Sequence, residues 1–194
     1  MSILTPLQES ILILLGIKNQ IEVELKSIQS KERVQDEDLK FTVCNYIQIL
    51  VCSFLEEWWK LERLGTDSEI QKTLKVASPA IDRIRKWKGL AKVRSQLLAH
   101  PHRDSNGRFK TPWQVFARYS APTAYGETIV LGNCANKATP VVFKRHAKEC
   151  ELAFAIVESQ AEEIDDKGVR TVGEIRAELM KVDQKITEQF RCIE

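Results

Sequence analysis

The sequence is poor in the residues that interrupt helices. Only eight glycines and six prolines occur in 194 residues. This scarcity argues against a protein of many short strands and tight turns, and it favours long helices. Because 43% of the residues are hydrophobic and 29% are charged, we expect a folded globular chain and not a disordered one. The length predicts one domain, with room for a short appendage.

Paired cysteines and clustered metal ligands are also missing. The five cysteines are scattered and none forms a CxxC pair: Cys44, Cys52, Cys134, Cys150 and Cys192. We therefore predict reduced thiols in a cytoplasmic protein, without a disulfide framework or a zinc site. Three histidines with no clustered Cys or Asp argue against a metal centre. No glycine-rich phosphate motif occurs, so no cofactor is predicted.

The chain has no run of about 20 apolar residues and no basic leader followed by an apolar segment, so neither a membrane span nor a signal peptide is expected. Its most apolar part is 41–59, in which 13 of 19 residues are apolar or aromatic. Asn45, Gln48 and Glu56 are among the polar residues that interrupt this part. A helix that is apolar on most of its surface is typical of the centre of a bundle.

The hydrophobic spacing predicts an all-α protein of about five to six helices. A first helix of roughly 24 residues begins at Pro6 with Thr5 as its N-cap, and a second covers 37–64. A short helix is expected over 66–76, and another from Pro79 to about Ala99. A long helix should run from Phe143 to near Gly168.

Residues 101–139 break this pattern, because prolines, glycines and polar runs are concentrated there. We predict a long irregular loop before the penultimate long helix, with one or two helical turns at Trp113–Tyr119 and a short strand at Glu127–Leu131. A stretch of this length is either a binding loop or an insertion without function. The predicted organisation is thus a helical domain over 1–168, with 101–139 as a loop insertion, and a C-terminal amphipathic helix over 169–194.

The C-terminal helix has its own start signal. Thr171 and Glu174 form the pattern of a capping box. The apolar residues that follow are spaced by three or four: Val172, Ile175, Leu179, Val182, Ile186 and Phe190. A narrow apolar seam on a charged helix is typical of packing against a partner helix.

Positive charge is concentrated between Arg83 and Lys110. This stretch has nine Lys or Arg, one acid, and both His100 and His102, whereas the rest of the chain carries 20 basic and 26 acidic residues. Such asymmetry, hidden in the overall net charge of +2, is what attracts phosphate-bearing partners.

Arg94 stands out within the basic stretch. On a helical wheel from Pro79 to Ala99 it falls on the apolar face near Trp87, whereas Lys88 and Lys92 fall on the solvated side. A guanidinium on an apolar face needs a carboxylate partner or a polar cleft. The structural alternative is pairing with Glu56, Glu57 or a backbone carbonyl. The functional alternative is a cleft shared with His100, six residues further on.

Other conspicuous residues have a structural interpretation. His146, at the start of a core helix, is expected to be a buried, hydrogen-bonded histidine. Trp58, Trp59 and Trp87 are predicted core aromatics.

An Arg and a His separated by four to six residues at the end of a helix resemble the signature of HEPN domains (higher eukaryotes and prokaryotes nucleotide-binding). Arg94 and His100 fit it with five residues between them, and HPHRD resembles the ending of many such motifs. The length and helix order look most like the HEPN proteins of phage abortive-infection systems. The resemblance covers residues 1–165 and implies a HEPN-like helical bundle.

The resemblance further implies a metal-independent endoribonuclease that acts as a toxin or antiphage effector. Arg94 would bind the phosphate and His100 would act as acid or base, at a cleft between two copies of the chain. Phosphate or RNA contacts would come from Ser95, His102, Arg103, Lys88 and Lys92. The chemistry suits these side chains, because His titrates near neutral pH and Arg binds phosphate through a planar fork.

Two other interpretations stay open. Active relatives usually have Asn, Asp or His where this chain has Ser95, which favours a non-catalytic RNA- or nucleotide-binding module. The C-terminal seam instead favours a helical antitoxin or adaptor. The expected partners are accordingly RNA, a second copy of the chain, and a cognate antitoxin or regulatory protein, with no membrane.

Overall fold

The computed structural model describes residues 3–29, 37–65, 67–94, 111–160 and 171–191, without the side chains of 112–113, 183 and 185–191. Within these ranges the regular structure is helical and no strand occurs, which confirms the predicted all-α class. The chain divides into two units, residues 1–159 and 160–194. The predicted boundary at 168 lies outside the described residues.

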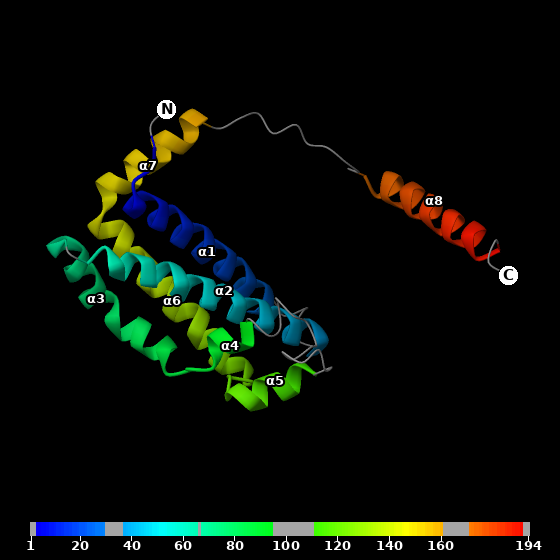
Figure 1. Cartoon of the computed structure of the whole chain (residues 1–194), viewed down its shortest axis with the longest axis horizontal. Helices are drawn as coiled ribbons and strands as arrows, with labels where there is room; N and C mark the ends of the chain where they lie inside the picture. Colours follow the sequence, from blue (N-terminus) through cyan, green and yellow to red (C-terminus); the bar gives the residue numbers. More distant parts are fainter. Residues whose placement is uncertain (1–2, 30–36, 66, 95–110, 161–170, 192–194) are drawn as a thin grey trace. The chain divides into compact units, whose positions relative to one another are not determined.

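Four long helices form the core of the first unit: α1 (Pro6–Gln29), α2 (Glu37–Arg63), α3 (Ser68–Arg85) and α6 (Tyr125–Arg145). Figure 1 shows α1, α2 and α6 side by side, with α3 along α6, and successive helices of this set run in opposite directions. Apolar side chains of all four helices meet in one core that includes Ile11, Phe54 and Trp58. The packing is that of an antiparallel helical bundle.

The start of α1 and both ends of α2 agree with the sequence prediction. Thr5 Oγ1 accepts a hydrogen bond from the Gln8 amide, and Gln8 Oε1 accepts one from the Thr5 amide, so the first helix begins with reciprocal capping. α2 is buried at many positions, as predicted for a central helix. By length and composition it is the single helix in the described part of the chain that could cross a membrane, and here it packs among α1, α3 and α6.

The predicted helix from Pro79 to Ala99 is wrong. α3 begins after Asp67, whose side chain accepts a hydrogen bond from the Glu69 amide, and it continues through Pro79 to Arg85. A proline leaves the carbonyl four residues earlier without its usual donor. Here that carbonyl belongs to Lys75, and the Ser78 hydroxyl donates to it at 3.0 Å. The chain then turns and forms the separate short helix α4 (Leu90–Arg94).

The predicted irregular loop is wrong over 125–139, whereas the helical turns predicted at Trp113–Tyr119 are confirmed. α5 (Pro112–Tyr119) begins at a capping box formed by Thr111 and Gln114. α6 then occupies 125–145, including the predicted strand at 127–131. Gly132, which counted as a helix breaker, lies where α6 approaches α1 and α2: a Cβ there would be 3.2 Å from Ile21 and 3.3 Å from Ile47.

The predicted long helix from Phe143 to Gly168 is interrupted at His146. α6 ends there and α7 (Ala147–Gln160) follows. Two apolar residues of α7, Phe154 and Val157, are exposed. Gln8 Nε2 donates to Glu149 Oε2 at 2.9 Å and links the start of α1 to α7.

The second unit contains α8 (Val172–Arg191). Its predicted capping box is confirmed, because the Glu174 amide donates to Thr171 Oγ1 and the Thr171 amide donates to Glu174 Oε2. The described seam residues Val172, Ile175, Leu179 and Val182 are all exposed.

Candidate functional site

The site is built on α4, which lies against α2 and α5. Leu90 and Val93 are buried, and Val93 packs in a small second core with Val115 and Phe116 of α5. Gly89 precedes α4 and makes this approach possible, since a Cβ at that position would lie 1.8 Å from the carbonyl oxygen of Tyr119. α4 is thereby held with its last residue, Arg94, beside α2.

Arg94 forms an ion pair with Glu56 of α2, through Nη1 and Oε1. The Arg94 side chain is 31% exposed and the Glu56 side chain 61% exposed, so the pair is open to solvent. The structural alternative for Arg94, pairing with Glu56, is therefore what the fold contains. The prediction that Arg94 lies on an apolar helix face assumed one continuous helix from Pro79 to Ala99. That helix does not exist, because α3 ends at Arg85, nine residues before Arg94.

Cys52 lies beneath this pair and is nearly fully buried. Its Sγ donates to the carbonyl oxygen of Leu90 at 3.3 Å and so ties α2 to α4. Burial raises the pKa of Cys52 to about 12, with a smaller lowering by Arg94 and a smaller raising by Glu56. The thiol is therefore a neutral structural donor and not a nucleophile.

Several basic residues of the 83–110 stretch are paired with carboxylates. Arg83 lies 2.6 Å from Glu127, and Arg85 lies 2.8 Å from Glu62. Glu127 also accepts a hydrogen bond from Trp87 Nε1 at 2.5 Å. These contacts neutralise part of the charge that the composition suggested.

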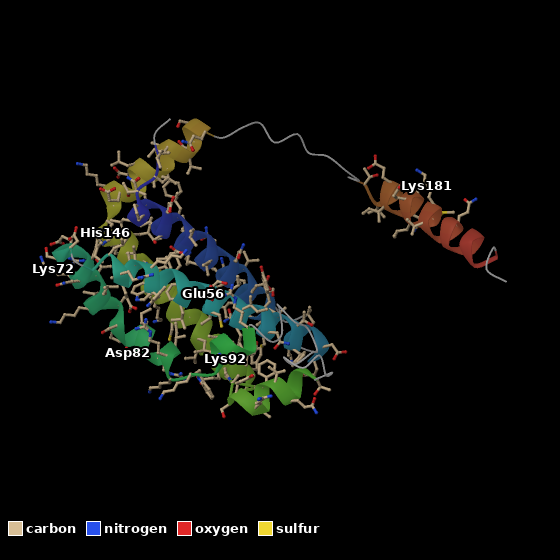
Figure 2. The ribbon with its side chains drawn as sticks, viewed as in Figure 1. Glu56, Lys72, Asp82, Lys92, His146 and Lys181 are labelled. Carbon is tan, nitrogen blue, oxygen red and sulfur yellow. The ribbon has the colours of Figure 1, made fainter. Side chains whose placement is uncertain are left out.

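The predicted solvated side of the stretch is confirmed for Lys88 and Lys92, which are both exposed. Figure 2 shows Lys92 on α4. The predicted site residues Ser95, His100, His102 and Arg103 lie outside the described residues. Of the proposed catalytic pair, the structure thus describes Arg94 alone.

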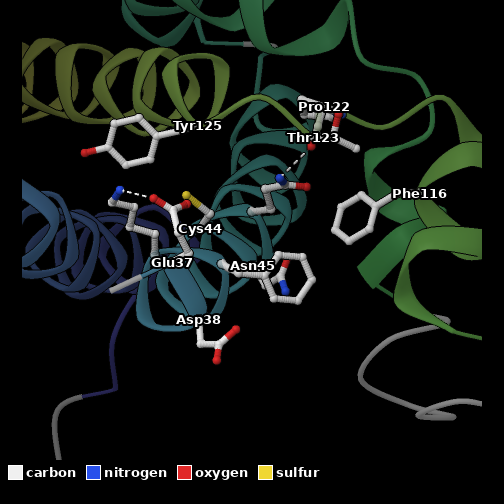
Figure 3. Close-up of a pocket in the computed structure, with 11 residues that line it drawn as sticks. Glu37, Asp38, Cys44, Asn45, Phe116, Pro122, Thr123 and Tyr125 are labelled. Carbon is white, nitrogen blue, oxygen red and sulfur yellow. Dashed lines mark hydrogen bonds and ion pairs between the residues drawn. The ribbon is translucent and has the colours of Figure 1, made fainter. Parts of the chain in front are cut away.

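A cavity of about 420 Å³ opens between α2, α5 and the start of α6 (Figure 3). Its walls combine aromatic rings, amides and charged groups: Glu37, Asp38, Lys40, Phe41, Cys44, Asn45, Gln48, Phe116, Pro122, Thr123 and Tyr125. A much smaller cavity beside it is lined by Arg94, Cys52 and Leu90, and it shares Asn45, Gln48 and Phe116 with the large one. The side chains shared by the two cavities, Asn45, Gln48 and Phe116, therefore separate Arg94 from the large cavity.

Gln48 is the best-defined polar group of the cavity. It is only 4% exposed, and its Nε2 donates to the carbonyl oxygen of Pro122 at 2.9 Å and to Thr128 Oγ1 at 3.2 Å. Since a carbonyl oxygen can only accept, the amide nitrogen must face Pro122. The orientation of Gln48 is thus fixed, and its buried Oε1 has no hydrogen-bond partner within the described part of the chain.

Two ionisable groups of the cavity are accounted for by their neighbours. Lys40 Nζ lies 2.5 Å from Glu37 Oε1. Burial raises the pKa of the Cys44 thiol, which outweighs the lowering by Thr128, so this cysteine is neutral too. The cavity offers hydrogen bonds and aromatic surface and no activated nucleophile among these residues.

Sequence reasoning missed the cavity. Asn45 and Gln48 entered the prediction only as interruptions of an apolar stretch. Their spacing of three residues was the available signal, because it places two amides on the same face of a helix that is otherwise apolar.

His146 belongs to a separate network at the end of the bundle where α3 begins (Figure 2). It is 8% exposed, and its Nε2 lies 2.9 Å from Thr73 Oγ1. The Thr73 hydroxyl donates its one proton to the carbonyl of Glu69, so it accepts from both His146 and Arg145 Nε. His146 is therefore protonated on Nε2, as a structural histidine, which confirms its predicted core role.

The predicted core tryptophans behave differently from one another. Trp58 is buried and packs at 5.6 Å from the Phe54 ring. Trp59 is exposed, which contradicts the prediction, and the guanidinium of Arg63 lies 4.4 Å from its ring centre.

No protein-family model, curated protein or solved structure matches this chain. Within the described residues, no group of three or more His, Cys, Asp or Glu side chains is arranged to hold a metal ion. The site must accordingly be interpreted from its own geometry.

Proposed function

We propose that the chain is a metal-independent endoribonuclease of the HEPN type, which acts as a toxin or antiphage effector in the cytoplasm. The observation that supports this most is the exposure of Arg94. Glu56 gives the guanidinium a carboxylate partner, and the Arg94 side chain nevertheless remains 31% exposed to solvent. A guanidinium has five N–H donors, so it can bind a phosphate while it contacts Glu56.

The proposed reaction uses the RNA's own 2′-hydroxyl. Its oxygen attacks the adjacent phosphorus and loses its proton to a base, while the bond from phosphorus to the 5′-oxygen breaks and that oxygen takes up a proton. The products carry a 2′,3′-cyclic phosphate and a 5′-hydroxyl. His100 supplies the proton transfers and Arg94 stabilises the negative charge that develops on the phosphate oxygens. Pairing of two chains would bring two such sites to one cleft.

Cleavage of single-stranded RNA by the intact protein in the presence of EDTA tests this proposal. We expect His100→Ala to lower the cleavage rate by about 100-fold or more, in line with the contribution of general acid–base catalysis. Arg94→Ala should lower it as well. Lys72→Ala, at an exposed lysine on α3, is the matched control and should cleave as the wild type does. Equal cleavage by wild type and His100→Ala would refute the proposal.

A non-catalytic RNA- or nucleotide-binding module is the second candidate. It is favoured by Ser95 and by the Arg94–Glu56 pair, which already gives the guanidinium a partner. Charge reversal of Lys88 and Lys92 should then weaken RNA binding and reduce its dependence on salt. Reversal of Lys72 and Lys75, also exposed, controls for net charge. RNA binding without EDTA-resistant cleavage would select this candidate.

A further inference from the structure

The apolar seam of α8 is open to solvent. Its described members are between 47% and 76% exposed: Val172, Ile175, Leu179 and Val182. They are separated by three, four and three residues, so they occupy alternating a and d positions of a heptad repeat. A seam of this kind favours a second helix as the partner that covers it.

Charged residues flank the seam on both sides. Arg176 and Asp183 each follow a d residue, so they occupy e positions on one side of the helix. Glu178 and Lys185 each precede an a residue, so they occupy g positions on the other side. Residues at e and g positions face the partner helix of a coiled coil, and their charges determine its identity and orientation. The four charges can therefore be compared with each possible arrangement of a partner.

A parallel pair of α8 helices would bring like charges together. In a parallel coiled coil, each g residue faces the e residue five positions further along the partner helix. Glu178 would then face the partner's Asp183, and two-fold symmetry would repeat this repulsion. Lys185 would face the partner's Phe190, so no pair of opposite charges would compensate.

An antiparallel pair of α8 helices can satisfy all four charges. In this arrangement g residues face g residues and e residues face e residues. Glu178 can then face the partner's Lys185, and Arg176 can face the partner's Asp183. Because symmetry repeats both contacts, the interface gains opposite-charge pairs along both of its sides.

The same charges select the register of the antiparallel pair. The favourable register places Leu179 opposite the partner's Val182 and Ile175 opposite the partner's Ile186, so apolar residues meet along the seam. A shift by one heptad in either direction would place two charged residues opposite their own copies: Glu178 and Arg176 in one direction, or Lys185 and Asp183 in the other. Each shift therefore replaces attraction by repulsion.

The side chain of Glu178 is accessible to a partner. It contacts Lys181 of the same helix at 3.1 Å and remains 56% exposed. Exposed ion pairs between neighbouring turns of a helix are weak. The contact with Lys181 therefore does not prevent Glu178 from facing a second helix.

We propose that α8 binds α8 of a second copy of this chain as an antiparallel two-helix coiled coil, with Leu179 opposite the partner's Val182. The charges at the e and g positions select this partner, its orientation and its register. The inference goes beyond the ribonuclease and does not rest on it, because neither Arg94 nor His100 takes part in the interface.

Sedimentation equilibrium of the intact protein over a range of concentrations tests the inference through the dissociation constant of the dimer. Glu178→Lys should raise this constant about ten-fold, because both symmetric contacts with the partner's Lys185 become repulsive. A parallel pair predicts the opposite effect, since position 178 would then face the partner's Asp183. Lys185→Glu should weaken the dimer by a similar factor.

Combining the substitutions gives a second measurement. The double variant Glu178→Lys/Lys185→Glu exchanges the two charges and should regain the affinity of the wild type. An equimolar mixture of the two single variants should form a mixed dimer that is tighter than the dimer of either variant alone. Lys181→Glu is the matched control, because it changes the charge of α8 as Lys185→Glu does, at a c position outside the seam where the side chain is 67% exposed. It should dimerise as the wild type does.

Four results would overturn the inference. A wild type that is monomeric at every concentration would show that the seam does not bind a second copy. A tighter dimer of Glu178→Lys would exclude the antiparallel orientation, and a double variant as weak as the single ones would exclude the register. Equal dissociation constants for all variants would place the dimer contact outside α8. Circular dichroism shows whether each variant keeps its helical content.

Discussion

Arg94 and Glu56 form an ion pair whose acidic member is mostly exposed. Solvent-exposed pairs of this kind contribute about 0–1 kcal/mol to stability. The carboxylate matters more for binding, because it competes with phosphate for the same guanidinium. A substitution at Glu56 can therefore test the proposed phosphate contact of Arg94 without unfolding the protein.

We predict that Glu56→Gln binds single-stranded RNA about two- to five-fold more tightly than the wild type, since a competing negative charge is removed. Fluorescence anisotropy at fixed salt measures this. Glu62→Gln is the control, because Glu62 lies on α2 as Glu56 does, pairs with Arg85 of α3, and changes the net charge by the same amount when substituted. It should have a smaller effect on RNA affinity. Weaker binding by Glu56→Gln would instead show that Glu56 orients Arg94 for its ligand.

His146 gives a prediction for pH. Burial, and next the charge of Arg145, lower the pKa of His146 below its ordinary value of 6.5. The unfolded chain therefore binds a proton at a pH where the folded chain does not, and stability rises with pH in this window. Its contribution is present above about pH 6.5 and is lost as the pH falls toward the lower folded-state pKa.

Urea unfolding at pH 7.5 and pH 5.5 measures this contribution. The wild type should lose free energy of unfolding at the lower pH, and His146→Gln should lose less of it, because glutamine can still donate to Thr73 without titrating. An identical loss in both proteins would show that other groups cause the acid sensitivity.

At the scale of elements, the position of α4 depends on the absence of a side chain at Gly89. A Cβ there would collide with the backbone of Tyr119, which cannot rotate away as a side chain can. α4 and α5 would have to move apart. The small core that includes Val93 and Phe116 would then lose part of its packing.

We predict that Gly89→Ala lowers the free energy of unfolding by about 1–3 kcal/mol, the usual cost of overpacking. Gly16→Ala is the matched control, because a Cβ at Gly16 meets nothing within 4 Å in the middle of α1. That variant should be more stable than the wild type by about 0.5–1 kcal/mol. Equal effects of the two substitutions in urea unfolding would contradict the close contact of α4 with α5.

The helices that the sequence predicted correctly are those whose ends have local signals. Thr5 and Thr171 mark such ends, and α1 and α8 begin after them. α6 was missed because the glycines of 101–139, among them Gly132, were counted as breakers. Gly132 is instead required by the approach of Ile21 and Ile47, and a contact between helices more than 80 residues apart in sequence leaves no local pattern. Its neighbours Ala135 and Ala138, both fully buried, share the same small-residue face.

The candidate site shows the same division. The exposure of Lys88 and Lys92 could be predicted from charge alone. The environment of Arg94 could not, because the wheel that placed it assumed one helix where Gly89 allows a turn and a second helix. The unpaired Gln48 oxygen depends on Pro122, which lies 74 residues away.

At the scale of the whole molecule, α8 carries an apolar seam that is exposed in its described part. A seam with this spacing packs well against a second helix of the same kind. The proposed homodimer gives it such a partner. This association would be a property of the intact chain and not of the helical bundle alone.

We predict that the wild-type protein is a dimer and that Leu179→Glu shifts it toward the monomer. Light scattering coupled to size-exclusion chromatography measures the mass. Met180→Glu is the matched control: Met180 is about as exposed as Leu179 but lies outside the seam. A monomeric wild type, or equal masses for both variants, would show that α8 does not hold copies together.

The reactivity of the Cys52 thiol can report on movement of α4 away from α2. A buried, neutral thiol bonded to Leu90 does not react with alkylating reagents while α4 stays in place. The rate at which Cys52 is alkylated would therefore report how often α4 separates from α2. Peptide mass spectrometry distinguishes Cys52 from the other cysteines. RNA bound to Arg94 should lower the rate at which Cys52 is alkylated. Ligand binding can then be detected as protection of a sulfur atom that the ligand does not contact.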